Sequence, residues 1–263
     1  MKKRLDIYMV ERGVVESRSQ AQRLIMAGRV RVGQAIAQKP GQMVDEGTII
    51  EVTQPPAYVS RGGEKLAAAL AAFGLLDLSG KICVDVGAST GGFTDCLLQH
   101  GAARVFAVDV GYGVLHWRLR RDERVVVMER TNARYLKGFG ERIDIVTVDA
   151  SFISLKILLP VIRQWFNKDT GEVIALIKPQ FEAGQQEAAR GEGVIRNPLI
   201  HQRVLKELVD FCQQEGWVIR GLIRSPLTGP KGNAEFLIWL ALQGSPLPDL
   251  EKRIEAVTRP ESH

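Results

Sequence analysis

From residue 60 onward, short apolar segments alternate with amphipathic ones. The apolar segments are rich in Val and Ile and predict seven strands, at 81–86, 104–108, 124–128, 143–148, 172–177, 217–224 and 234–242. Amphipathic stretches such as 66–73 and 200–214 lie between most of these strands and predict helices. This alternation predicts an α/β fold in which helices cover both faces of a mostly parallel sheet. Because the last two strands have no helix between them, we expect one of them to be antiparallel.

Residues 1–52 show a different pattern of short elements. Ser17 can cap a helix whose apolar residues are spaced helically over 20–27 and which Gly28 ends. Short stretches at 30–32 and 48–52 predict strands. Two adjacent prolines follow and exclude both helix and sheet pairing. We therefore predict four regions: a small N-terminal α+β domain (1–52), a linker (53–59), an α/β domain (60–243) and a C-terminal tail (244–263).

The chain of 263 residues has a formal net charge of +5 and a pI of about 9.2. Such a charge favours polyanionic partners, because Lys and Arg release counterions when they contact phosphates. Cys83, Cys96 and Cys212 lie far apart in the sequence, which is typical of a protein of the reducing cytoplasm. No run of about 18 apolar residues predicts a membrane span. The histidines lack metal-ligand spacing, so we expect neither a membrane anchor nor a bound metal.

A glycine-rich loop, Gly87-Ala88-Ser89-Thr90-Gly91-Gly92, directly follows the first predicted strand of the α/β domain. Glycines at this place let the backbone approach a ligand, and the next helix offers free N–H groups. The second strand ends at Asp109, whose carboxylate can accept hydrogen bonds from both hydroxyls of a ribose. These features fit a nucleoside cofactor. NAD stays open at this point, although the loop departs from the G-x-G-x-x-G pattern that faces a pyrophosphate.

Four polar residues stand where the apolar pattern of the sheet ends. Lys65 lies at the start of the first helix of the α/β domain. Asp149 and Lys178 end the fourth and fifth predicted strands, and Glu235 opens the last one. The ligand crevice of such a sheet lies outside the carboxyl ends of its strands. If the last strand is antiparallel, its first residue reaches the same edge, so we expect the four side chains to converge there.

These residues resemble the motifs of known families. The string Asp85-x-Gly-x-x-x-Gly-Gly is similar to the first motif of Class I methyltransferases. The four polar residues resemble the Lys-Asp-Lys-Glu tetrad of FtsJ-like ribose 2′-O-methyltransferases, and the strings 58–63, 148–154 and 178–182 are similar to those of the TlyA (hemolysin A) family. The resemblance implies a Rossmann-like Class I methyltransferase domain that methylates cytidine ribose in ribosomal RNA. It also implies S-adenosyl-L-methionine as the cofactor.

The same resemblance leads to a hypothesis for each site residue. Lys178 would take or steer the proton of the 2′-hydroxyl, helped by the positive charge of Lys65. Asp149 would orient Lys178 and border the methyl group, and Glu235 would hold Lys65 or the substrate ribose. The expected cofactor contacts are Asp85, Gly87, Ala88, Ser89, Gly91, Gly92, Asp109, Asn132 and Asp149.

The N-terminal segment 2–52 resembles the alpha-L RNA-binding domain, through Arg4-Leu5-Asp6 and the strings 17–21 and 25–33. That family places arginines against RNA phosphates and recognises shape more than sequence. The implied partner is ribosomal RNA or a ribosomal subunit. The implied RNA contacts are Arg4, Arg18, Arg23, Arg29 and Arg31.

Three other functions stay open on the sequence alone. A nucleotide-dependent oxidoreductase would leave both lysines and Glu235 without a role. A non-catalytic ribosome-assembly factor would keep the cofactor only as a structural ligand. Membrane lysis, which the word hemolysin suggests, finds no strongly apolar amphipathic helix in the sequence. The sequence indicates neither the oligomeric state nor the position of the modified nucleotide.

Overall fold

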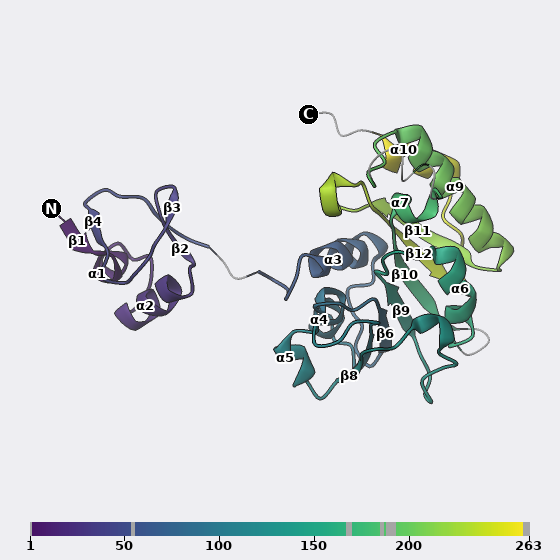
Figure 1. Cartoon of the computed structure of the whole chain (residues 1–263), viewed down its shortest axis with the longest axis horizontal. Coiled ribbons are helices and arrows are strands. Elements are labelled where there is room, and N and C mark those ends of the chain that lie inside the picture. Colours follow the sequence, from purple (N-terminus) through teal and green to yellow (C-terminus); the bar gives the residue numbers. More distant parts are fainter. Residues whose placement is uncertain (1, 54–55, 167–169, 185–186, 188–192, 260–263) are drawn as a thin grey trace. The chain divides into compact units, whose positions relative to one another are not determined.

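The chain divides into two compact units, Met1–Pro56 and Ala57–His263, each with its own hydrophobic core (Figure 1). The structure, a computed structural model, describes residues 2–53, 56–166, 170–184, 187 and 193–259. Part of the predicted linker, at 54–55, and the last four residues of the predicted tail lie outside the described residues.

The first unit packs two helices against short antiparallel strands around buried Leu5, Met9 and Ile25. Ser17 caps the second helix as predicted, because its hydroxyl accepts a hydrogen bond from the Gln20 backbone N–H at 3.3 Å. Strand β1 pairs with β4, and β3-β2-β5 form a second small sheet. The elements are β1 (Lys2–Arg4), α1 (Leu5–Glu11), α2 (Arg18–Met26), β2 (Val30–Val32), β3 (Ala35–Ile36), β4 (Met43–Asp45) and β5 (Ile50–Val52).

The second unit is built on one seven-stranded sheet, and this confirms the predicted fold class. The strands are β6 (Ile82–Val86), β7 (Arg104–Val108), β8 (Val125–Met128), β9 (Ile145–Val148), β10 (Glu172–Ile177), β11 (Val218–Arg224) and β12 (Phe236–Ala241). Their order in the sheet is β11-β12-β10-β9-β6-β7-β8. Strands β6 to β10 are parallel, and β12 runs antiparallel to both β10 and β11, as the missing helix between the last two strands predicts.

Helices cover both faces of this sheet, because alternate residues of its strands are apolar on each side (Figure 1). One face packs against α3 (Gly62–Phe73), α4 (Gly92–Gln99) and α5 (Trp117–Arg120). The other packs against α6 (Leu155–Arg163), α9 (Pro198–Gln214) and α10 (Leu250–Thr258). Helix α10 lies in the predicted tail, and its Ile254 and Val257 are buried in the core of the second unit.

The register of the sheet brings the polar ends of four strands to one edge. Val86 pairs with Val148, so the glycine loop after β6 lies beside Asp149. Ile177 pairs with Phe236 across the antiparallel strands. Lys178 directly follows Ile177, and Glu235 directly precedes Phe236, so both lie just beyond this pair. The carboxyl end of β10 therefore meets the amino end of β12 at the edge where a ligand crevice is expected.

Candidate active site

Lys178 lies between two partners from the segment that follows β9. Its Nζ is 2.7 Å from Asp149 Oδ1, and it donates a hydrogen bond to Ser151 Oγ at 3.0 Å. The Lys178 side chain is only 10% exposed, so it is held by these partners and screened little by solvent. Lys178 also precedes α7 (Pro179–Glu182), which begins with a proline. Proline lacks an N–H group, but at the first position of a helix this costs no hydrogen bond.

Lys65 and Glu235 form a second ion pair, although 170 positions separate them in the sequence. Lys65 Nζ donates to Glu235 Oε2 at 2.5 Å, and the Glu235 side chain is fully buried. Its other oxygen, Oε1, has no hydrogen-bond partner among the described residues. Gly229 lies so close that a Cβ there would stand 2.1 Å from Oε1. A side chain at position 229 would displace this carboxylate, whose Oε1 can accept a hydrogen bond from a ligand.

Both ion pairs line one cavity of about 280 Å³. The four residues predicted to form the tetrad are thus brought together around one cavity, which the glycine loop also lines. The loop contributes Gly87, Ala88, Ser89 and Gly92 to the wall. The segment between β11 and β12 contributes Thr228, Gly229 and Pro230, which we did not single out in the sequence.

A second cavity, of about 480 Å³, adjoins the first and shares Gly87, Ser89 and Asp149 with it. Asp109 and Asn132 line this cavity, as the predicted cofactor site requires. Asp109 accepts hydrogen bonds from the backbone N–H groups of Ser89 at 2.7 Å and Gly111 at 2.6 Å. Each carboxylate oxygen keeps a further lone pair, so the side chain can still accept hydrogen bonds from a ribose.

Two of the glycines in the loop, Gly87 and Gly91, are needed for different reasons. Gly87 has a φ of +84°, and a Cβ there would lie 2.7 Å from the Asp149 carbonyl oxygen. Gly91 has a φ of +96°, and a Cβ there would clash with the Leu119 side chain. Gly87 therefore allows the close approach of the loop to Asp149, whereas Gly91 shapes the turn into α4 and lines neither cavity.

Asp85 lies beneath the loop rather than beside the cavities. Its carboxylate is fully buried and accepts hydrogen bonds from Thr94 Oγ1 at 2.7 Å and Thr147 Oγ1 at 3.2 Å. Burial raises the pKa of Asp85 to about 7. Asp85 lines neither of the two cavities, and its hydrogen bonds join the end of β6 to α4 and β9.

The arginines predicted to bind RNA are placed in two ways. Arg4 and Arg18 both contact the buried Asp6, at 3.1 Å and 2.9 Å, while their side chains stay 44% and 55% exposed. Hydrogen bonds from Arg4, Gln22 and Arg18 hold the pKa of Asp6 well below its usual range. Arg23 is exposed, and Arg29 and Arg31 are partly buried in the same unit. Asp6 was visible in the sequence only as part of a motif, with no sign that it would be buried.

Sequence reasoning missed two residues beside the tetrad. Ser151 binds Lys178, and Phe152 lines the second cavity with a side chain that is 90% exposed. Both lie in the string 148–154 that carries the family resemblance, which is the only signal that pointed to them. Phe152 also adopts a φ of +63°, which is rare outside glycine and costs about 1 kcal/mol or more.

Other site classes find no support in the described part of the chain. There, no group of three or more His, Cys, Asp or Glu side chains could hold a metal ion. The three cysteines are free and buried. Over the same residues, every helix is too short or too polar to cross a bilayer.

Comparison with known proteins agrees with this geometry. An S4 domain model matches residues 3–50. The chain is 46% identical to the 16S/23S rRNA (cytidine-2′-O)-methyltransferase TlyA of Mycobacterium tuberculosis, over 91% of this chain and 90% of that protein. It is 42% identical to Hemolysin A of Brachyspira hyodysenteriae, over 89% and 98% of the two chains.

A solved structure from Streptococcus thermophilus, named provisionally as a hemolysin, is also similar. It superposes with a TM-score of 0.73 and 42% identity, over 98% of this chain and 94% of that one. A model described as FtsJ-like methyltransferase matches residues 58–242, the segment that holds both cavities and both ion pairs. The chain therefore belongs to the FtsJ-like methyltransferase family, with an S4 domain joined in front of its catalytic domain.

Proposed function

We propose that this protein transfers the methyl group of S-adenosyl-L-methionine to the 2′-hydroxyl of a cytidine in ribosomal RNA. The observation that carries the proposal is the pair of adjoining cavities. One is lined by Asp109 and Asn132, which suit a nucleoside, and the other by two lysine–carboxylate pairs. Asp149 lines both, so it lies where a methyl donor and an acceptor hydroxyl would meet.

The second cavity suits S-adenosyl-L-methionine by its size and its hydrogen-bond acceptors. Its volume of about 480 Å³ lies within the range of small-molecule sites. Gly87 lets the loop approach Asp149 closely at the wall of this cavity, and Asp109 can accept bonds from both ribose hydroxyls. When bound, the cofactor supplies an electrophilic methyl carbon whose sulfonium leaves as a neutral thioether.

Lys178 is the residue proposed to steer the acceptor hydroxyl and its proton. Lys178 Nζ lies 2.7 Å from Asp149 Oδ1 and donates a hydrogen bond to Ser151 Oγ. In its neutral form this amine has a lone pair that would accept the proton of the 2′-hydroxyl as the hydroxyl oxygen attacks the methyl carbon. Asp149 and Ser151 thereby fix the position of the Lys178 amino group. Holding the reacting atoms in line can contribute about 7–11 kcal/mol, and a positioned proton acceptor about 10²–10⁴-fold more.

Glu235 and Lys65 are proposed to hold the substrate ribose. The unpartnered Glu235 Oε1 is buried beside the cavity, where leaving it without a hydrogen bond costs about 1–3 kcal/mol. A ribose hydroxyl that donates to this oxygen would remove that cost. Lys65 holds the carboxylate in place through the 2.5 Å pair.

The RNA class follows from the first unit and from the relatives. The S4 domain presents exposed Arg4, Arg18 and Arg23, which suit the phosphates of a folded RNA. A relative covering most of the chain is named for cytidine 2′-O-methylation of ribosomal RNA. The alternative function, an oxidoreductase, would leave the two lysine–carboxylate ion pairs of the cavity without a role.

The test is tritiated methyl transfer from S-adenosyl-L-methionine to isolated ribosomal subunits and to free ribosomal RNA, with wild type and Lys178→Ala. We expect label in RNA, resistant to alkali at the modified position and absent with the variant. Transfer to a base, or to protein, would contradict the proposal. Cofactor binding without transfer to any of these RNAs would favour a non-catalytic assembly factor.

A further inference from the structure

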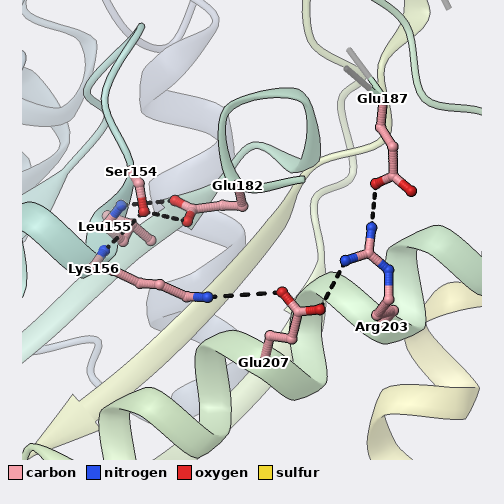
Figure 2. Close-up of polar contacts among 7 residues, drawn as sticks. All are labelled: Ser154, Leu155, Lys156, Glu182, Glu187, Arg203 and Glu207. Carbon is pink, nitrogen blue, oxygen red and sulfur yellow. Dashed lines mark hydrogen bonds and ion pairs between the residues drawn. The ribbon is translucent and has the colours of Figure 1, made fainter. Parts of the chain in front are cut away.

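A glutamate outside the tetrad fastens the two segments that carry Lys178 and its partners. Glu182 ends α7, four positions after Lys178. Its Oε2 accepts a hydrogen bond from Ser154 Oγ at 2.6 Å, and its Oε1 accepts one from the Leu155 backbone N–H at 2.7 Å (Figure 2). Both donors lie at the start of α6, directly after the segment that holds Asp149.

Glu182 lies beside the first turn of α6, where a carboxylate is favoured. Ser154 caps α6, and its Oγ accepts a hydrogen bond from the Lys156 backbone N–H at 3.1 Å while donating to Glu182. Unpaired N–H groups of a first helical turn favour a negative charge by about 0.3–1 kcal/mol. Burial raises the pKa of Glu182, so its charge depends on these partners.

Together with the catalytic pair, these bonds close a ring. The segments 149–155 and 178–182 are joined at one end by Lys178 with Asp149 and Ser151, and at the other end by Glu182. Between the two ends, the Phe152 and Phe181 rings contact each other with centroids 5.1 Å apart. A segment fixed at both ends cannot shift without breaking one of these contacts.

We propose that Glu182 is a positioning residue that holds Lys178 against Asp149 and Ser151, and this inference rests on the proposed function. Glu182 lines neither cavity, so it acts through the segments it joins and not on the reacting atoms. Misplacing a catalytic group by about 1 Å can lower a rate about 10²-fold. The cost of losing Glu182 therefore falls on the rate of methyl transfer.

The neighbouring ion pairs show what a merely structural contact would look like. Glu207 on α9 lies 3.8 Å from Lys156 Nζ and 2.7 Å from Arg203 Nη1, and Arg203 also pairs with Glu187 (Figure 2). Their side chains are 30–44% exposed, and such pairs contribute about 0–1 kcal/mol. Glu207→Ala is therefore a control that removes a carboxylate from the same region without touching the ring.

The experiment compares Glu182→Ala, Glu182→Gln, Ser154→Ala and Glu207→Ala with wild type. Glu172→Ala is a second control, because this partly buried carboxylate lies at the opposite end of β10. Single-turnover methyl transfer is measured at saturating RNA and cofactor, together with the Kd for S-adenosyl-L-methionine. Hydrogen exchange of the backbone over 149–158 is measured on the same full-length proteins and needs no activity.

We expect Glu182→Ala to lower the single-turnover rate at saturating cofactor by about tenfold or more. Residues 149–153 also line the cofactor cavity, so the Kd for S-adenosyl-L-methionine should rise in this variant as well, and saturation keeps that rise out of the rate. Gln can accept from Leu155 N–H and donate to Ser154 Oγ, so Glu182→Gln should keep most of the rate. Ser154→Ala should fall between them. Exchange over 149–158 should rise in Glu182→Ala and stay unchanged in both controls.

Two results would overturn the inference. One is a Glu182→Ala rate no lower than that of the controls. The other is a Glu182→Gln rate as low as that of Glu182→Ala, since the amide keeps both bonds. If wild type transfers no methyl group to any RNA, the proposed function fails, and exchange over 149–158 still decides whether Glu182 holds this segment.

Discussion

Each of the two units has a buried carboxylate paired with basic side chains, but the exposure of the bases differs. In the first unit, Asp6 is buried while the Arg4 and Arg18 side chains are 44% and 55% exposed. In the second, Glu235 and its partner Lys65 are both withdrawn, with Lys65 12% exposed. One carboxylate organises cations that face outward, and the other holds a cation inside a cavity.

This difference in exposure corresponds to two different roles. Exposed arginines contact phosphates in the presence of solvent and counterions. Their contribution to RNA affinity is therefore moderate and falls with ionic strength. Withdrawn pairs are screened little, and removing one partner leaves the other buried and uncompensated. We therefore expect the first unit to tolerate single changes and the second to lose its chemistry with one.

The largest effect should come from the withdrawn pair. Lys65→Ala and Glu235→Ala are each expected to lower the single-turnover rate of methyl transfer about 10²-fold or more, because each leaves its partner misplaced. The double variant should lose little more than either single one. If the fold losses in rate of the two single variants multiplied in the double variant, the two residues would act independently, which would contradict the paired account.

A smaller effect should follow at the cofactor cavity. Asp109→Ala removes the acceptor for the ribose and two hydrogen bonds to the loop, at Ser89 and Gly111. We expect the Kd for S-adenosyl-L-methionine to rise about tenfold to a hundredfold, since each lost bond to a charged group costs about 1.5–3 kcal/mol. Calorimetric titration measures it. RNA affinity without cofactor should stay the same, and a parallel loss of RNA affinity would contradict the separation of the two sites.

At the RNA surface, the effect should be smaller still and salt-dependent. Arg18→Ala is expected to weaken binding of ribosomal RNA about tenfold or less and to reduce the slope of log K against log salt by about one. Filter binding between about 50 and 200 mM salt measures both. An unchanged slope would mean that Arg18 contacts no phosphate.

The last effect concerns the stability of the first unit and its dependence on pH, not affinity or rate. Asp6→Asn should destabilise the first unit by about 1–3 kcal/mol at neutral pH, because it removes charged hydrogen bonds to Arg4, Arg18 and Gln22. The folded state lowers the pKa of Asp6 from its ordinary value of 3.8, so this stability is present above pH 4 and declines as the pH falls further. Hydrogen exchange of residues 2–53 in the full chain, followed from pH 7 to 3, should show the two proteins converge. A difference that widens toward low pH would contradict the assigned charge.

The sequence predicted the sheet well because each strand is a short, continuous apolar run. The seven predicted strands agree with β6 to β12 to within two residues at each end, and the antiparallel last strand follows from the absence of a helix before it. Once strand ends are known, polar residues such as Lys178 and Glu235 can be placed at one edge. The strand register then decides which of them pair.

The burial of a polar side chain was harder to predict than its place at the end of a strand or helix. The motif that contains Asp85 suggests a ligand contact, but Thr94 and Thr147 hold this carboxylate under the loop, and only the packing of α4 and β9 reveals that. Asp6 and Glu182 likewise look like surface acids until the arginines and the start of α6 are seen around them. The strands β1, β3 and β4 span two or three residues each, which is too short for a periodic pattern.

The most direct test of the account measures two quantities on two variants. Lys178→Ala and Arg18→Ala are compared with wild type for RNA Kd and for the single-turnover rate at saturating RNA. The account predicts that Lys178→Ala loses the rate and keeps the Kd, whereas Arg18→Ala raises the Kd and keeps the saturated rate. If Arg18→Ala lowered the saturated rate as much as Lys178→Ala does, docking and chemistry would not be divided between the two units as described.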